Sequence, residues 1–209
     1  MRRWRRTRAF GLACAIVFGS ALVLGGLPGR AWGDVELPNF ATCMSAEMAR
    51  YERAIKAVLA TQTAEIAPSV FDVSGVEFCG TIGIVLCDRS DNPLGCQKFL
   101  AVQQDILRAR VLDQLPAPDA QADPDAYASA LYANTWALAH GTSAGQDCAG
   151  TEPVLETWCR VREANGRLRA AVLAWQVARY QGRAAPALEA GWVSPPTPVR
   201  PRLRPEALK

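Results

Sequence analysis

Residues 43–62, CMSAEMARYERAIKAVLATQ, decide the fold class, because their apolar side chains recur every three or four residues. That spacing places the apolar side chains on one face of an α-helix and the polar side chains on the other. The apolar face comprises Met44, Met48, Tyr51, Ile55, Val58 and Leu59. The stretch therefore predicts an amphipathic helix that packs against a core.

Further segments carry the same pattern, and we expect three more helices, starting near Cys96, Asp123 and Thr151. The helix from about Cys96 to Leu115 is amphipathic, and its apolar face is expected to be buried. That face comprises Phe99, Val102, Ile106, Leu107, Val111 and Leu115.

The two later helices are predicted from their starts and their composition. Segment 123–140 is rich in alanine and begins with an aspartate–proline pair, which favours the start of a helix. Thr151 is expected to cap a long helix that ends at about Tyr180. Within it, Asn165-Gly166 predicts a kink or a break.

Segment 70–86 has a different composition. It is rich in valine, isoleucine and phenylalanine, and three glycines interrupt it. We expect either a short pair of strands or a buried irregular segment there.

The first 33 residues have the order of a secretory signal peptide. Five arginines lie within the first eight residues, an apolar run follows from Ala9 to Leu27, and Ala31-Trp32-Gly33 forms a cleavage site of small residues. We expect cleavage after Gly33, by the ordinary or the twin-arginine route, and a contact with membrane only through this leader. A permanent membrane anchor is the alternative.

Removal of residues 1–33 changes the charge balance. This segment holds six of the 23 basic residues and none of the 20 acidic residues, so the mature chain has a net charge of −3. Because binding of nucleic acid needs a basic face, an acidic mature chain disfavours nucleic acid as a partner.

Six cysteines remain after cleavage, and an even number in an exported chain indicates disulfides. They are Cys43, Cys79, Cys87, Cys96, Cys148 and Cys159. Six cysteines allow 15 pairings. Sequence spacing favours two local disulfides, Cys87–Cys96 and Cys148–Cys159, with Cys43–Cys79 as the longer one. No Cys-x-x-Cys pair occurs, which argues against zinc, haem and thioredoxin-like chemistry.

The predicted fold class is therefore mainly α: a small disulfide-stapled domain of about four helices, with a short irregular or β-like segment near residues 70–86. This domain is expected to span residues 34–190. Residues 191–209 are rich in proline and arginine and predict a disordered basic tail.

Residues that carry catalysis or hold a cofactor are not recognisable. His140 is the single histidine, and we expect it to be exposed at a helix end. The pairs Glu152/Glu156 and Asp119/Asp123 would be candidates in a hydrolase. The tryptophans at 136, 158 and 175 are expected in the core, and Trp192 in the tail, with a ligand groove lined by these tryptophans as the alternative. The sequence predicts no catalytic, cofactor-binding or metal-binding residue.

One segment resembles a known family. Asp147-Cys148-Ala149 is followed by Glu152-Pro153-Val154-Leu155-Glu156-Thr157-Trp158-Cys159 and a helix with leucines that ends at Tyr180. This order is similar to the cysteine-paired helical module of periplasmic lysozyme-inhibitor proteins. The resemblance covers Asp147–Tyr180 alone, its cysteine spacing is one residue short, and the family's Leu-x-x-Leu-Asp signature is missing. It implies binding to a cell-wall enzyme and transfers no functional residue.

Three functions are compatible with these observations. The first is a non-catalytic, periplasmic or secreted binding or accessory protein whose partner is a protein of the envelope or periplasm, with inhibition of a cell-wall enzyme as one form. The second is a component of an envelope or secretion assembly that docks through its proline-rich tail. The third is a small hydrolase with unrecognised acidic residues.

Overall fold

The computed structural model describes residues 37–61, 68–119, 126–141, 148–196 and 198. The elements, in chain order, are α1 (Phe40–Thr61), a 3₁₀ turn η1 (Pro68–Phe71), α2 (Ser74–Asp88), α3 (Pro93–Leu112), α4 (Tyr127–His140) and α5 (Pro153–Tyr180). The predicted signal peptide, the Asp123 cap and most of the tail lie outside these ranges. None of the helices searched among the described residues is long and apolar enough to cross a bilayer.

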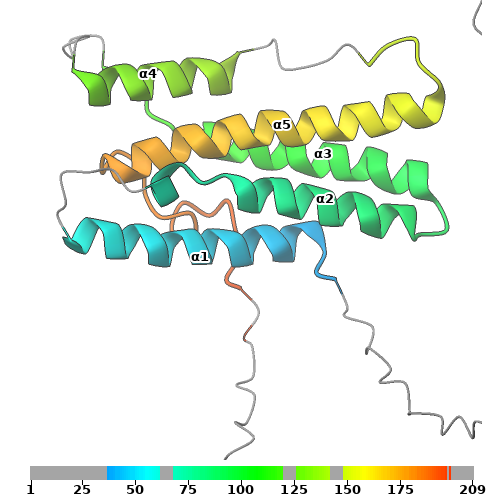
Figure 1. Cartoon of the computed structure of the whole chain (residues 1–209), viewed down its shortest axis with the longest axis horizontal. Coiled ribbons are helices and arrows are strands. Elements are labelled where there is room, and N and C mark those ends of the chain that lie inside the picture. The colour runs from blue at the N-terminus through cyan, green and yellow to red at the C-terminus, as the bar shows by residue number, and fades with distance from the viewer. Residues whose placement is uncertain (1–36, 62–67, 120–125, 142–147, 197, 199–209) are drawn as a thin grey trace, which may run out of the picture. The chain divides into compact units, whose positions relative to one another are not determined.

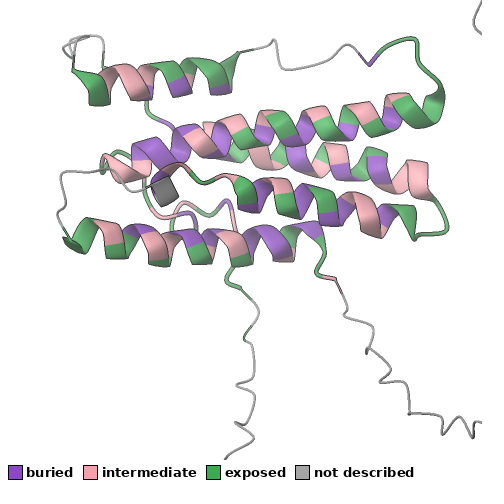
Figure 2. Ribbon diagram, in the orientation of Figure 1, coloured by how far each residue is buried: buried purple, intermediate pink, exposed green. Residues whose placement is uncertain are grey.

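Helix α5 is the centre of the fold. It packs against α2, α3, α4 and η1, and α1 packs against α2 and η1 (Figure 1). Its side chains at Val161, Leu168, Val172 and Trp175 are completely buried. Four alanines of the same helix, Ala164, Ala171, Ala174 and Ala178, are buried as well. Small side chains let neighbouring helices approach closely, so α5 can be covered on several sides at once (Figure 2).

The prediction of a mainly helical, disulfide-stapled domain is confirmed. The expected disulfides are present: Cys43–Cys79, Cys87–Cys96 and Cys148–Cys159. The first connects α1 with α2, the second connects the end of α2 with α3, and the third connects the segment before α5 with α5. Two of them therefore connect consecutive helices, and the third holds the preceding segment against α5.

Segment 70–86 is helical and contains no strand, which adds a fifth helix to the expected four. Its three glycines lie in the buried part of α2. A Cβ at each would collide with a neighbouring side chain: Gly75 with Glu47, Gly80 with Asn165 and Gly83 with Leu100. These glycines therefore serve close helix packing, and neither the strand pair nor the irregular segment expected there forms.

Helix starts were predicted within a few residues. α3 begins at Pro93, because the Asn92 side chain accepts a hydrogen bond from Gly95 N at 3.1 Å and caps the helix. The prediction for α5 was wrong in its cap: Glu152 holds the N-cap position, and the Thr151 hydroxyl donates to Cys148 O. α5 also continues without a break past Asn165 and Gly166.

Helix α3 faces the core with a side that is only partly the predicted one. Val111 and Leu115 are buried as expected and Leu107 is partly buried against the core, whereas Phe99, Val102 and Ile106 are exposed. The buried residues of α3 are Gln97, Leu100, Gln104 and Val111. The Cys87–Cys96 disulfide fixes the start of α3, and next to it Gln97 Nε2 donates to Asp88 Oδ1 at 2.6 Å. One turn further, Leu100 packs against Gly83. These contacts set the rotation of α3 about its axis.

Candidate functional site

Helix α3 carries three large apolar side chains on its outer surface. Phe99, Val102 and Ile106 are 62%, 52% and 50% exposed. They follow one another at spacings of three and four residues, so they form a continuous line along one face of the helix. We call this line the α3 stripe. The sequence pattern had placed these residues in the core, and the rotation of α3 moves them to the surface.

A groove of about 350 Å³ runs beside the α3 stripe. Its other wall consists of the start of α1 and the segment that follows α5, with Phe40, Met44, Trp192 and Val193. Trp192 was expected in the exposed tail and is instead 3% exposed, with its ring edge-on to Trp175 at 5.0 Å between centroids. The folded domain therefore extends beyond residue 190, and its last part helps to form the groove.

The charged side chain that lines the groove is a cation. Arg110 lies there, one turn after Ile106. Asp105, the acidic residue between Phe99 and Arg110, is held by Arg167 of α5 at 3.0 Å. The stripe therefore has a positive charge at its C-terminal end.

The cysteines supply structure to this site and no chemistry of their own. All six are in disulfides, so none of them offers a thiolate. Cys148, Cys159 and Glu163 come within 4.8 Å of one another, which is a distance that would suit a metal ion. Because both sulfur atoms belong to one disulfide, this group does not have the thiolate ligands that a metal would need.

Two of the candidate catalytic residues, His140 and Glu156, interact with a residue of their own helix. His140 is exposed at the end of α4, where its ring stacks on Trp136 at 3.9 Å and its Nδ1 lies 2.9 Å from Trp136 O. Glu156 forms an ion pair with Arg160, one turn along the surface of α5. Asp119 is described, whereas its candidate partner Asp123 lies outside the described residues.

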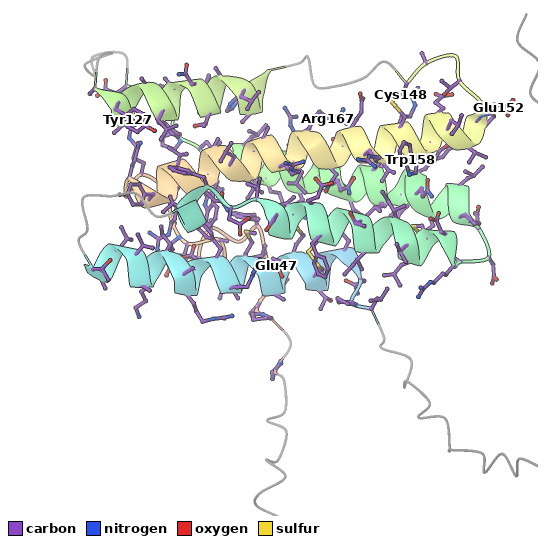
Figure 3. The ribbon with its side chains drawn as sticks, in the orientation of Figure 1. Glu47, Tyr127, Cys148, Glu152, Trp158 and Arg167 are labelled. Atoms are coloured by element: carbon purple, nitrogen blue, oxygen red, sulfur yellow. A yellow bond between two sulfur atoms is a disulfide. The ribbon has the colours of Figure 1, made fainter. Side chains whose placement is uncertain are left out.

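The burial of the tryptophans differs in part from the prediction. Trp175 is completely buried and Trp136 is partly buried, as expected of core residues. Trp158 was also expected in the core but is 43% exposed, with the Arg162 guanidinium 4.7 Å from its ring centroid. Trp158 therefore belongs to the surface of α5, and Figure 3 shows its place on that helix.

Comparisons of the chain with protein-family models, with curated proteins and with solved structures found no match.

Proposed function

We propose that this chain is an exported, non-catalytic binding protein, and that the α3 stripe with its groove is the surface that binds a protein of the envelope or periplasm. One observation carries the proposal: Phe99, Val102 and Ile106 form an apolar line on a disulfide-anchored helix, and the fold leaves them uncovered. Exposed apolar surface beside a groove is typical of protein–protein contact sites.

The partner's chemistry follows from the stripe. From Phe99 to Arg110, α3 extends about 16 Å at 1.5 Å per residue. A complementary partner segment has two or three apolar anchors for the stripe and the groove, and a carboxylate near Arg110. The apolar anchors supply most of the affinity, whereas the carboxylate increases the rate of association and selects the partner.

Several features support a binding role in preference to catalysis. The cysteines are held in disulfides, and the candidate carboxylate Glu156 is occupied by Arg160. The charged leader and the three disulfides support export to an oxidising compartment. The resemblance of Asp147–Tyr180 to a lysozyme-inhibitor module makes a cell-wall enzyme the first partner to test.

The test uses the mature chain and a purified lysozyme as the first probe, then individual purified envelope proteins. We expect saturable binding that is weakened at least tenfold by Phe99→Asp and by Ile106→Asp. Phe78→Asp is the matched control, since Phe78 lies on α2 and is 54% exposed. Circular dichroism checks the fold of each variant. Equal binding by the stripe variants and the control contradicts the proposal. The proposal is also contradicted if the mature chain binds none of the probes.

A truncation separates this surface from the proline-rich tail. Because Trp192 is buried and belongs to the folded domain, the chain is shortened after Pro198 and not at residue 191. Binding that survives this truncation assigns the contact to the domain. Loss of binding on truncation, with the stripe variants unaffected, assigns it to the tail and overturns the role of the stripe.

A further inference from the structure

A second, larger hollow lies beside α5. This cleft has a volume of about 750 Å³, and its walls come mainly from α3, α4 and α5. The volume is within the range of clefts that hold small organic ligands, which is about 300–1,000 Å³. Four of its lining residues are arginines: Arg108, Arg162, Arg167 and Arg169. Glu163 is the single acidic residue among those that line it.

Two of these arginines are already paired with carboxylates. Arg167 contacts Asp105 at 3.0 Å and Glu163 at 3.8 Å. Arg169 contacts Glu77 of α2 at 2.6 Å. Both lie on α5, and Figure 3 shows Arg167 in the middle of that helix. These two side chains therefore shape the wall of the cleft, while their charges are balanced within the protein.

The other two arginines have no carboxylate partner within the described ranges. Arg108 of α3 donates from one terminal nitrogen to Ala139 O of α4 at 2.8 Å, whereas its Nε is buried without an acceptor. Arg162 of α5 lies over the Trp158 ring. Neither guanidinium forms an ion pair with a described carboxylate, and the buried Nε–H of Arg108 lacks an acceptor. A planar guanidinium with free N–H groups is well suited to a carboxylate or a phosphate.

Apart from the arginines and Glu163, the lining of the cleft is apolar. Leu138 of α4 is 60% exposed, and Ala170 and Leu173 of α5 line the same hollow. A ligand that fits both parts has an anionic group and a hydrocarbon portion. Such a ligand displaces water from the leucines while its anion accepts hydrogen bonds from the guanidinium groups.

We propose that the cleft between α3, α4 and α5 binds a small amphiphilic anion, with its phosphate or carboxylate at Arg108 and Arg162 and its hydrocarbon portion against Leu138 and Leu173. This site is distinct from the α3 stripe, because Arg108 and the stripe lie on different faces of α3. The inference therefore adds a small-molecule site to the proposed protein-binding function and does not depend on it.

Titration calorimetry of the mature chain with octyl phosphate tests the site. We expect one equivalent to bind, and we expect inorganic phosphate and octanol each to bind at least tenfold more weakly. Arg162→Gln should weaken octyl phosphate binding at least tenfold. Arg160→Gln is the matched control, since Arg160 lies two residues away on α5, pairs with Glu156 and is not among the cleft-lining residues. Equal affinities for these two variants overturn the proposal.

A second substitution, at Leu138, tests the site without the risk of a folding defect. Arg108→Gln removes a hydrogen bond between α3 and α4, so a loss of binding there can have a structural origin. Leu138 is exposed, and Leu138→Asp places a negative charge in the cleft without removing a buried contact. We expect Leu138→Asp to weaken octyl phosphate binding at least tenfold and Leu138→Asn to weaken it much less. An equal effect of both substitutions contradicts the role of charge.

The same anion could come from a free metabolite or from a lipid. Sedimentation with phosphatidylglycerol vesicles distinguishes the two sources. Vesicle binding that Arg162→Gln abolishes supports the proposal with a lipid headgroup as the source. Binding of octyl phosphate without vesicle binding supports it with a free anion. Failure of both probes to bind overturns the proposal.

Discussion

Gly80 of α2 lies directly against the side chain of Asn165 of α5, so close that a Cβ at position 80 would overlap the carboxamide. Asn165 is 6% exposed, and its Oδ1 accepts a hydrogen bond from Gln104 Nε2 of α3 at 3.4 Å. Three helices therefore meet at one buried amide. Their spacing depends on the absence of a side chain at position 80.

Gly80→Ala should lower the free energy of unfolding by about 1–3 kcal/mol, because the added methyl group forces α2 and α5 apart or displaces Asn165. Gly166→Ala is the control: this glycine is also within a helix, and a Cβ there would meet nothing within 4 Å. It should raise the free energy of unfolding by about 0.5–1 kcal/mol. Urea denaturation measures both. Stabilisation by both substitutions would show that α2 and α5 do not approach at Gly80.

Neighbouring residues on α3 give the sharpest test of its rotation. Leu100 is 3% exposed and packs in the core, whereas Phe99 is 62% exposed. Leu100→Ala should therefore lower the free energy of unfolding by about 2–5 kcal/mol. Phe99→Ala should change it by about 0.5 kcal/mol or less. Thermal and urea unfolding of the two variants measure these losses. A larger loss for Phe99→Ala than for Leu100→Ala would show that α3 buries Phe99, as the sequence pattern predicted.

The helices were largely predictable from the sequence, because apolar spacing records the period of a helix. The face that α3 buries was predictable only in part, since its inner side carries Gln97 and Gln104 and its outer side carries Phe99 and Ile106. Rotation there is set by contacts with neighbouring helices: the Cys87–Cys96 disulfide connects α3 with α2, and Gln104 donates to Asn165 of α5. A pattern within one helix holds no information about such contacts.

The helix α2 was missed for a related reason. Glycine is a poor helix former in isolation, so its three glycines indicated strands or an irregular segment. In the folded chain each of these glycines lies against the side chain of a neighbouring helix. The benefit of a glycine at such a position arises only when the neighbour is present, and tertiary packing then outweighs local propensity.

The two binding surfaces differ in how much the sequence revealed of them. The stripe residues Phe99, Val102 and Ile106 were named but assigned to the core. The cleft gave no sequence signal, because Arg108 and Arg162 are far apart in the chain and each resembles an ordinary surface arginine. Only the packing of α3 and α4 on α5 brings them to one hollow.

The disulfides should account for every cysteine of the mature chain. Iodoacetamide applied before reduction should leave the mass unchanged, and modification of any pair would disprove the three-disulfide arrangement.

Removal of the Cys43–Cys79 disulfide by double alanine substitution should lower the free energy of unfolding by about 1 kcal/mol more than removal of Cys87–Cys96 does. Their sequence separations are 36 and 9 residues, and a longer loop gains more entropy in the unfolded state. Urea denaturation of the two double variants measures the difference.

Tyr51 should make the fold sensitive to alkaline pH. Its hydroxyl is directed at Gln176 O, 3.3 Å away, and its ring packs on Trp175 at 5.3 Å. Burial raises the pKa of the Tyr51 phenol well above its usual value, the Glu52 carboxylate adds to this, and Arg179 opposes it. The folded state therefore holds the phenolic proton more tightly than the unfolded chain, in which the pKa is about 10.

The sign of the effect follows from this difference. The stabilisation by the neutral phenol is fully present below about pH 10 and is lost as the pH rises above that value, because the unfolded chain releases its proton first.

Tyr51→Phe should lower the free energy of unfolding by about 0.5–1.5 kcal/mol at pH 8, through the lost hydrogen bond. Between about pH 10 and 11.5 the original protein should lose stability more steeply than Tyr51→Phe. The pKa of Tyr132 is also raised by burial, but Tyr132 is present in both proteins and cancels in the comparison. Urea denaturation of both proteins across this range gives the two slopes, and parallel slopes would show that Tyr51 ionises as freely in the fold as in the unfolded chain.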